Sequence, residues 1–317
     1  MSPFVYDLGG FEVRSTIPLP GLRPLCHAAS ADAIHVDAAS GPVPAAGPVV
    51  FRWPGRYGLT LRVLDARWLL SSTAHGAAIV SADGRSVRCY PDASSSADWP
   101  DVLVRRILPR IVQWHGRIAL HASTVSEGPT ATVLLGPSRA GKSTLAAALR
   151  RDGGWTVLSD DISLIDGDAT PPMCMPAAAG LCLWPDSLSA FAQSAAACRI
   201  VAGHADKRWL DEDAGAAETA RPAGAIVVLM PCDPESDPGE ISLRRVAPKD
   251  AAMHAGAHMM CFNPSDAALF ARAWAAVGRL VDAVPMFSFS YPRGYERLPR
   301  VAAALAALLR DQVPVTT

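Results

Sequence analysis

The chain has 317 residues, of which 50% are hydrophobic and 19% are charged, and its formal net charge is −1. A chain of this length forms one large domain or two ordinary domains with separate hydrophobic cores. The near-zero net charge gives no electrostatic reason to expect nucleic acid or an anionic membrane surface as a partner.

The cysteines and the N-terminal residues predict a cytoplasmic protein. Seven cysteines are scattered without any CxxC spacing, a pattern typical of reduced thiols rather than of a disulfide framework. The first residues, MSPFVYDLGGFEVRS, lack the basic and apolar regions of a signal peptide. The longest apolar run, Ala223 to Met230, is too short to span a bilayer.

The first hundred residues consist of short apolar or alternating runs separated by Gly and Pro, such as FEVRSTI, PVVFRW and AAIVSADGRSVRCY. Asp83-Gly84 between two such runs indicates a hairpin. The polar stretch from Pro91 to Asp101 then interrupts the pattern as a linker would. We therefore predict a β-rich N-terminal domain over residues 1–100, whose separateness favours a role in binding a substrate or a partner.

The rest of the chain, residues 101–317, is predicted to form an α/β domain. The run from Val102 to Gly116 has apolar residues at helical spacing, and Pro109 should kink or split that helix. Strands and helices then alternate: RIALHAS, ATVLLG, the helix STLAAALRRD, WTVLSDD, AGAIVVLM, MFSFSYP and the C-terminal helix LPRVAAALAALLRDQ. Long apolar strands joined to helices indicate a sheet with largely covered faces.

A phosphate-binding loop follows the strand ATVLL and precedes a strong helix former. The run GPSRAGKS fits the pattern G-x-x-x-x-G-K-[ST], whose glycines let backbone N–H groups surround phosphate oxygens at the start of a helix. Lys142 is expected to reach the β- and γ-phosphates, and the Ser143 hydroxyl to bind Mg²⁺. The residues predicted to line the nucleotide are Gly136, Pro137, Ser138, Arg139, Ala140, Gly141, Lys142, Ser143 and Thr144.

Two acids and a histidine complete the candidate site. Asp160 and Asp161 follow the apolar run WTVL, where an acid at the end of a neighbouring strand normally completes the Mg²⁺ site. A second carboxylate can take the proton from an attacking hydroxyl, although one of the two could instead cap a helix or a turn. His121 ends a strand that we expect to lie beside the loop strand, where an imidazole can stabilise transferring charge.

The segments LHAS, LLGPSRAGKSTLAAAL and LSDD together resemble the catalytic domain of the HPr kinase/phosphorylase family. They are more similar still to the HPr-kinase-like serine kinases of peptide-maturation gene clusters, including those that phosphorylate lasso-peptide precursors. The resemblance implies a P-loop kinase domain of the HPr-kinase/PEP-carboxykinase type that uses ATP and Mg²⁺. By position it implies an active site of His121, Lys142, Ser143, Asp160 and Asp161, with Asp160 as the general base and Asp161 with Ser143 on the metal.

The resemblance covers Leu120 to Asp161, returns more weakly in GLCLWPDSLSAF and DKRWL, and does not reach the first hundred residues. An acidic-Arg-Gly segment that HPr kinases use for the reverse reaction is not found, which disfavours dephosphorylation and the carrier protein HPr as substrate. Lys207 and Arg208 are candidates for contact with the γ-phosphate, or else a solvated basic pair beside Asp206 and Asp211. HPr kinases form hexamers, but the interface residues of such a homo-oligomer are not recognisable in this sequence.

The sequence therefore predicts an ATP-dependent kinase that phosphorylates a Ser or Thr hydroxyl of a peptide or protein, with a lasso precursor peptide as one substrate that the resemblance implies. Two alternatives stay open: a kinase of a small hydroxylated metabolite, and a nucleotide-sensing protein with slow NTPase activity. The aspartate pair and His121 argue against the sensor, since a sensor needs no base for an acceptor hydroxyl.

Overall fold

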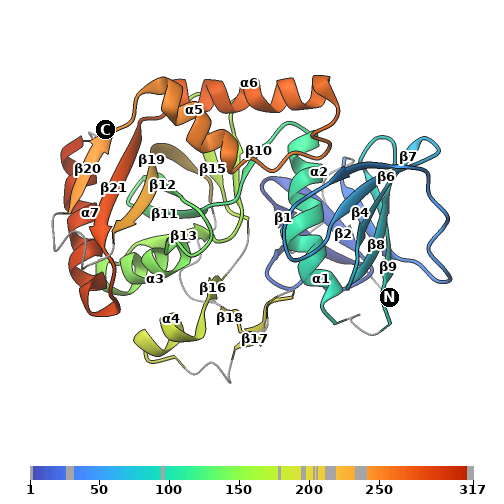
Figure 1. The fold of residues 1–317 in the computed structure, drawn as a ribbon, viewed down its shortest axis with the longest axis horizontal. Helices are drawn as coiled ribbons and strands as arrows, with labels where there is room; N and C mark the ends of the chain where they lie inside the picture. Colours follow the sequence, from blue (N-terminus) through green and yellow to red (C-terminus); the bar gives the residue numbers. More distant parts are fainter. Residues whose placement is uncertain are drawn as a thin grey trace. The chain divides into compact units, whose positions relative to one another are not determined.

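The computed structural model describes residues 3–25, 32–93, 97–177, 180–193, 198–202, 204, 206–210, 219–232 and 241–312. The chain divides into two compact units (Figure 1). The first comprises Met1–Arg117, Ile200–Asp206 and Cys261–Ala273, and the second comprises Ile118–Arg199, Lys207–Met260 and Trp274–Thr317. The helical residues before Arg117, which we assigned to the second domain, thus belong to the first unit, and the roles predicted for the two domains stay predictions.

The first unit is built on one nine-stranded sheet with the order β3-β1-β2-β4-β9-β8-β7-β6-β5. Most neighbouring strands are antiparallel, whereas β4 is parallel to both β2 and β9. The hairpin predicted at Asp83-Gly84 is present between β8 and β9. The strands are β1 (Phe4–Leu8), β2 (Phe11–Ser15), β3 (Arg23–Pro24), β4 (Ile34–Ala38), β5 (Val49–Arg52), β6 (Thr60–Leu64), β7 (Arg67–Ser72), β8 (Gly76–Val80) and β9 (Ser86–Pro91).

A helix with an irregular turn belongs to the same unit. It consists of α1 (Trp99–Val102), a π-helical turn η1 (Leu103–Ile107) and α2 (Leu108–Trp114). The helix does not split at Pro109 but has a π-helical turn directly before α2, as expected where a proline in the first turn of α2 has no N–H to donate to the preceding turn. Helix α1 begins inside the stretch that we predicted as a linker, and its Asp101 forms a buried ion pair with Arg105.

Two short segments from later in the sequence, Ile200–Asp206 and Cys261–Ala273, complete the core of the first unit. The backbone N–H of Ala202 donates to Asp101 Oδ2 over 3.0 Å, and Tyr57 Oη donates to the carbonyl oxygen of Ala202 over 2.8 Å. The backbone N–H of Phe262 donates to Gln113 Oε1, and the Phe262 ring stacks on Trp114 with centroids 4.6 Å apart. Residues far apart in the sequence therefore share one core.

The second unit is a mixed sheet with the order β10-β14-β15-β19-β12-β11-β13, which confirms the mixed α/β fold predicted from the sequence. Strand β19 is parallel to β12 and to β21, and β20 pairs with β21 at the edge. The strands are β10 (Ile118–Leu120), β11 (Ser123–Glu127), β12 (Thr130–Leu135), β13 (Thr156–Ser159), β14 (Ser163–Asp166), β15 (Met173–Met175), β19 (Arg221–Cys232), β20 (Ser242–Arg245) and β21 (Met286–Pro292).

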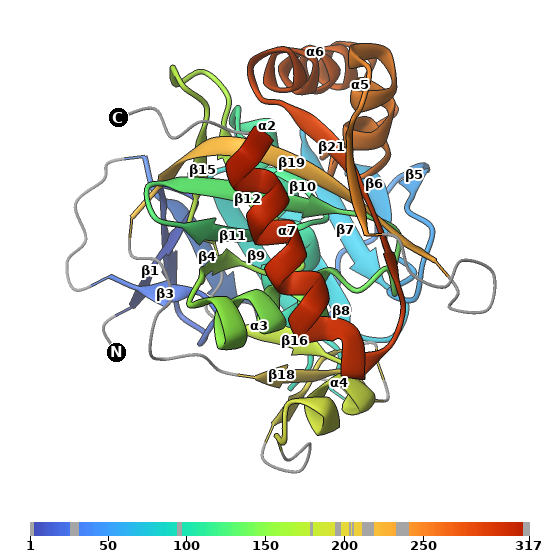
Figure 2. The same cartoon turned by 90° about the vertical axis from the view of Figure 1, so that its left-hand side faces the viewer.

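Helices cover both faces of this sheet (Figures 1 and 2). Helices α3 (Lys142–Gly153) and α7 (Leu298–Gln312) pack on the face to which Leu134 and Val227 point. Helix α5 (Pro248–Ala257) and the part of α6 (Ala267–Ala283) from Trp274 onward pack on the opposite face with Val133 and Val228. The alternation of buried side chains along β12 and β19 thus supplies two cores, as expected for strands that are buried on both sides.

A small sheet lies beside α3 and is continued by a short helix. Its strands are β16 (Leu181–Leu183), β18 (Arg208–Leu210) and β17 (Arg199–Ile200), and α4 (Pro185–Ala190) follows β16 directly. A short 3₁₀ turn, η3 (Tyr295–Arg297), connects β21 to α7. Within the described residues, no helix is both long enough and apolar enough to cross a membrane.

Candidate active site

The loop between β12 and α3 has the backbone geometry that a phosphate cradle requires. Gly136 and Gly141 have φ values of 151° and 95°, and Arg139 between them has a φ of 67°. A Cβ on Gly141 would lie 3.2 Å from Tyr291 Oη. Glycine is therefore favoured at this position for two reasons: it adopts a positive φ readily, and it leaves room for the Tyr291 hydroxyl. The loop then enters a helix of 12 residues, whose N-terminal N–H groups attract anions.

Lys142 is buried and folded back onto the loop. Its Nζ atom donates to the carbonyl oxygen of Gly136 over 2.8 Å and to that of Pro137 over 3.3 Å. These carbonyl bonds hold the ammonium group inside the turn of the loop, where a phosphate oxygen can replace a carbonyl as its partner. The position of Lys142 therefore fits the role that the motif predicts.

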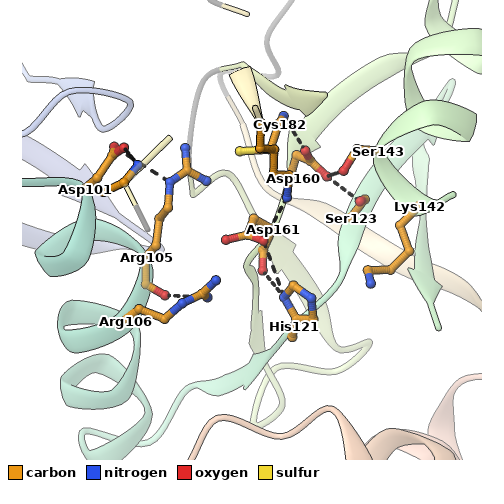
Figure 3. Close-up of polar contacts among 12 residues, drawn as sticks. Asp101, Arg105, Arg106, His121, Ser123, Lys142, Ser143, Asp160, Asp161 and Cys182 are labelled. Carbon is orange, nitrogen blue, oxygen red and sulfur yellow. Dashed lines mark hydrogen bonds and ion pairs between the residues drawn. The ribbon is translucent and has the colours of Figure 1, made fainter. Parts of the chain in front are cut away.

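Asp160 is fully buried and accepts three hydrogen bonds (Figure 3). Its Oδ1 accepts from Ser123 Oγ at 2.5 Å and from Ser143 Oγ at 2.9 Å, and its Oδ2 accepts from the backbone N–H of Cys182 at 2.7 Å. Three donors around one carboxylate fix its orientation. The structure thus joins Asp160, rather than Asp161, to the hydroxyl that the motif assigns to Mg²⁺.

Asp161 faces two basic side chains instead. Its Oδ1 lies 3.6 Å from His121 Nδ1 and 3.7 Å from Lys207 Nζ, and its backbone oxygen lies 2.9 Å from the same histidine nitrogen. Asp161 has a φ of 69°, a left-handed conformation that Asp tolerates better than most residues and that is common at functional sites. The sharp bend after Asp160 thereby turns two successive carboxylates toward different partners.

Lys207 and Arg208 separate in the structure. Lys207 reaches Asp161 as an ion pair, whereas Arg208 begins β18 and donates from Nη1 to the carbonyl oxygen of Lys207 over 3.5 Å. Of the two candidates, Lys207 therefore lies beside the aspartate pair. Asp211, part of the alternative interpretation of this pair, lies outside the described residues.

The strand placement predicted for His121 is wrong. Strand β10, which precedes His121, pairs with β14, and it is the following strand, β11, that pairs with the loop strand β12. The chain bends at His121, whose backbone N–H donates to the carbonyl oxygen of His258 over 2.8 Å. Strand β13, which directly precedes the aspartates, is likewise separated from β12 by β11. The bend nevertheless brings the imidazole to Asp161.

The residues present fit a nucleotide with a divalent cation. The loop offers one ammonium group and a helix N-terminus for phosphate oxygens, and one serine hydroxyl bonded to a buried carboxylate. Mg²⁺ is commonly held by one or two carboxylates together with substrate phosphates, so Asp160 and Ser143 form a suitable donor set. When bound, the ion would neutralise charge on the phosphates.

Helix α4 and the turn after β21 border the loop on another side. The guanidinium of Arg139 lies over the ring of Trp184 at 4.7 Å. The hydroxyls of Thr144 and Ser187 are 2.9 Å apart, and Ser187 Oγ lies 3.3 Å from Tyr295 Oη. These contacts connect the phosphate loop to two elements that are remote from it in the sequence.

Sequence reasoning missed several of these partners. Ser123 lies two residues after His121, and only its contact with Asp160 shows that it belongs to the site. Cys182 contributes a backbone N–H, which carries no residue-type signal at all. The segment GLCLWPDSLSAF was singled out for its resemblance alone, yet it contains Cys182, Trp184 and Ser187.

No family model matches the chain, and no curated protein matches it. Among solved structures, the chain is similar to the Hpr(Ser) kinase/phosphatase from Coxiella burnetii, at 12% sequence identity and a TM-score of 0.33. The match covers 61% of this chain and 95% of that chain. A likeness at this level carries no conclusion about activity, and the function proposed below is supported by the geometry of the site.

Proposed function

We propose that this chain is an ATP-dependent kinase that transfers the γ-phosphoryl group to a Ser or Thr hydroxyl of a peptide or protein. One observation carries the proposal: a phosphate loop whose Ser143 is bonded to one buried aspartate, with a second aspartate beside a histidine and a lysine. Binding and slow hydrolysis of a nucleotide need only the first carboxylate. A second carboxylate can act as the general base that takes the proton from an acceptor hydroxyl.

The contacts support a division of roles that differs from the one predicted by position. Asp160 already accepts three hydrogen bonds that fix its orientation, one of them from Ser143, so it suits the metal side together with Ser143. Asp161 lies against His121 and Lys207, whereas the loop hydroxyl of Ser143 donates to Asp160. We assign to Asp161 the role of the general base that removes the proton from the acceptor hydroxyl. Lys142, Lys207 and His121 would neutralise the charge on the transferred phosphoryl group.

The acceptor is proposed to be a peptide, because the sequence resembles kinases that modify precursor peptides. A precursor of a ribosomally made natural product is the substrate to test first. The conclusion about reaction type does not depend on this choice, since a small hydroxylated metabolite would use the same carboxylate.

The test uses γ-labelled ATP with Mg²⁺ and peptides encoded near the gene, and follows label into peptide and into free phosphate separately. Both Asp160→Asn and Asp161→Asn should abolish transfer. Asp160→Asn should also remove the Mg²⁺-dependent part of ATP affinity, whereas Asp161→Asn should retain it. The opposite pattern of affinities would return the base role to Asp160.

Retained transfer in Asp161→Asn would eliminate it as the base. Free phosphate alone, with no labelled peptide, would favour the nucleotide sensor, and labelled small molecules from a metabolite screen would favour the metabolite kinase. Ser126→Ala serves as a control, because Ser126 is buried in the same strand as Ser123 and makes no side-chain hydrogen bond within the described residues.

A further inference from the structure

A row of three hydroxyl groups leads away from the phosphate loop. Thr144, the residue after the motif serine, lies with its Oγ1 2.9 Å from Ser187 Oγ in α4. Ser187 Oγ in turn lies 3.3 Å from Tyr295 Oη in the turn η3. The row joins the loop to an aromatic ring whose residue is 44% exposed.

The row lies on a different side of α3 from the aspartates. Successive helical residues point about 100° apart, because the α-helix has about 3.6 residues per turn. Ser143 accordingly contacts Asp160, while its neighbour Thr144 contacts Ser187. The terminal phosphate of a bound nucleotide has to lie toward Asp160 and Asp161 if they act in transfer. The nucleoside, at the other end of the triphosphate, then leaves the loop away from them.

The segment that carries Tyr295 is fixed to the loop. Tyr291 Oη donates to the carbonyl oxygen of Ala140 over 2.9 Å, and Arg293 Nη1 donates to that of Arg139 over 3.4 Å. Burial raises the pKa of the Tyr291 hydroxyl, so this group remains a donor at neutral pH. These two bonds connect the segment before Tyr295 to the phosphate cradle, and the contact of Tyr295 Oη with Ser187 Oγ adds a third connection.

Helix α4 is braced against the loop in the same region. The guanidinium of Arg139 lies over the Trp184 ring at 4.7 Å, an arrangement in which cation and ring attract each other. Trp184 is the extended residue directly before α4, and Ser187 lies in the first turn of that helix, so Arg139 and Thr144 both contact the start of α4. The loop, α4 and η3 therefore meet around the Ser187 hydroxyl.

We propose that Tyr295 is the stacking platform for the base of the nucleotide, and that the hydroxyls of Ser187 and Thr144 lie along its sugar. The inference rests on the proposed function, because it places a nucleoside triphosphate on the loop. A stacking contact of this kind would make the site selective for its phosphate donor. A nucleoside triphosphate would bind more tightly than an inorganic polyphosphate, which has no base to stack on the ring. Exposed aromatic rings commonly hold bases in this way.

The experiment measures the affinities of ATP and of inorganic tripolyphosphate, both with Mg²⁺, for the full chain by calorimetry. Tyr295→Ala should weaken ATP binding by about 5- to 150-fold, the range for loss of one base–aromatic stack, and leave tripolyphosphate binding unchanged. Tyr295→Phe keeps the ring and should keep most of the preference for ATP. The exposed position of Tyr295 makes both variants compatible with folding.

A matched control lies at the other end of the same two helices. There the guanidinium of Arg151, near the end of α3, lies over the ring of Phe191 after α4 at 4.7 Å. Phe191→Ala removes a comparable arginine–aromatic contact far from the loop along α3. It should change neither affinity.

The outcomes separate this inference from the proposed function. Equal loss of both ligands in Tyr295→Ala, or no loss of either, would overturn the stacking role without bearing on the proposed function. Failure of the wild-type chain to bind either ligand would overturn the proposed function and the inference with it. A loss confined to ATP supports both.

Discussion

Removing the hydroxyl of Ser123 tests the arrangement of the aspartates most directly. Ser123 Oγ donates to Asp160 Oδ1 over 2.5 Å, and both side chains are completely buried. In Ser123→Ala, Asp160 keeps the donors from Ser143 and from the backbone of Cys182. The variant therefore removes one of three donors from a buried charge without removing the charge.

The magnitude follows from the charged acceptor. A hydrogen bond to an ionised group contributes about 1.5–3 kcal/mol, roughly twice the contribution of a neutral one. For a unit of this size, 1 kcal/mol shifts the thermal midpoint by about 2–4 °C, so we expect a decrease of about 3–12 °C. Ser123→Thr retains a hydroxyl in a strand, where a β-branched residue is well accommodated, and should recover most of the midpoint.

The assay is thermal unfolding followed by near-ultraviolet circular dichroism, with Ser126→Ala as the matched variant. Ser126 lies in the same strand, is also buried, and makes no side-chain hydrogen bond within the described residues. Its replacement should change the midpoint little. Equal shifts for Ser123→Ala and Ser126→Ala would refute the conclusion that the Asp160 carboxylate depends on Ser123.

Three further predictions concern other parts of the second unit. Gly278→Ala should raise the free energy of unfolding by about 0.5–1 kcal/mol, since its Cβ meets no atom within 4 Å, while Gly256→Ala should lower it because the Cβ overlaps the Trp274 ring; urea unfolding measures both. Gly141→Ala should abolish ATP binding in calorimetry, because its φ of 95° disfavours any Cβ. Burial lowers the pKa of His258 from 6.5 to about 4, so the unfolded chain takes up that proton first as the pH falls. Stability should therefore decrease between pH 6.5 and 4, and less so in His258→Asn, as thermal midpoints across that range would show; an equal decrease would contradict the assignment.

The sequence predicted the elements around the phosphate loop because their patterns are local. The strand before the loop and the helix after it have bounds within one residue of those predicted, and the π-helical turn before α2 fits the missing N–H of Pro109. What joins the elements is not local. The bend at His121 gives the strands on either side of it different neighbours, and no feature of the run ALHAS distinguishes that bend from a continuous strand.

The candidate site was predictable in its residue types but not in its contacts. The motif and the aspartate doublet identified which groups carry charge, and spacing placed both carboxylates near the loop. Which carboxylate meets Ser143 depends on the left-handed conformation of Asp161, a single backbone angle that several residue types tolerate. The donor from Cys182 is a backbone group, so any residue at that position would supply it.

The division of the chain between its units bears on the order in which they form during synthesis. The first unit includes the segments Ile200–Asp206 and Cys261–Ala273. In the first of these segments the backbone N–H of Ala202 donates to Asp101, and in the second the ring of Phe262 stacks on Trp114. A ribosome has therefore made most of the second unit before the first has its last segment. The first unit therefore completes its core only after these later segments have been made, unlike a domain that is continuous in sequence. A fragment cut at residue 117 would leave Trp114 without its stacking partner Phe262 and Asp101 without its backbone donor from Ala202, so we expect residues 1–117 alone to be less stable than the first unit in the full chain.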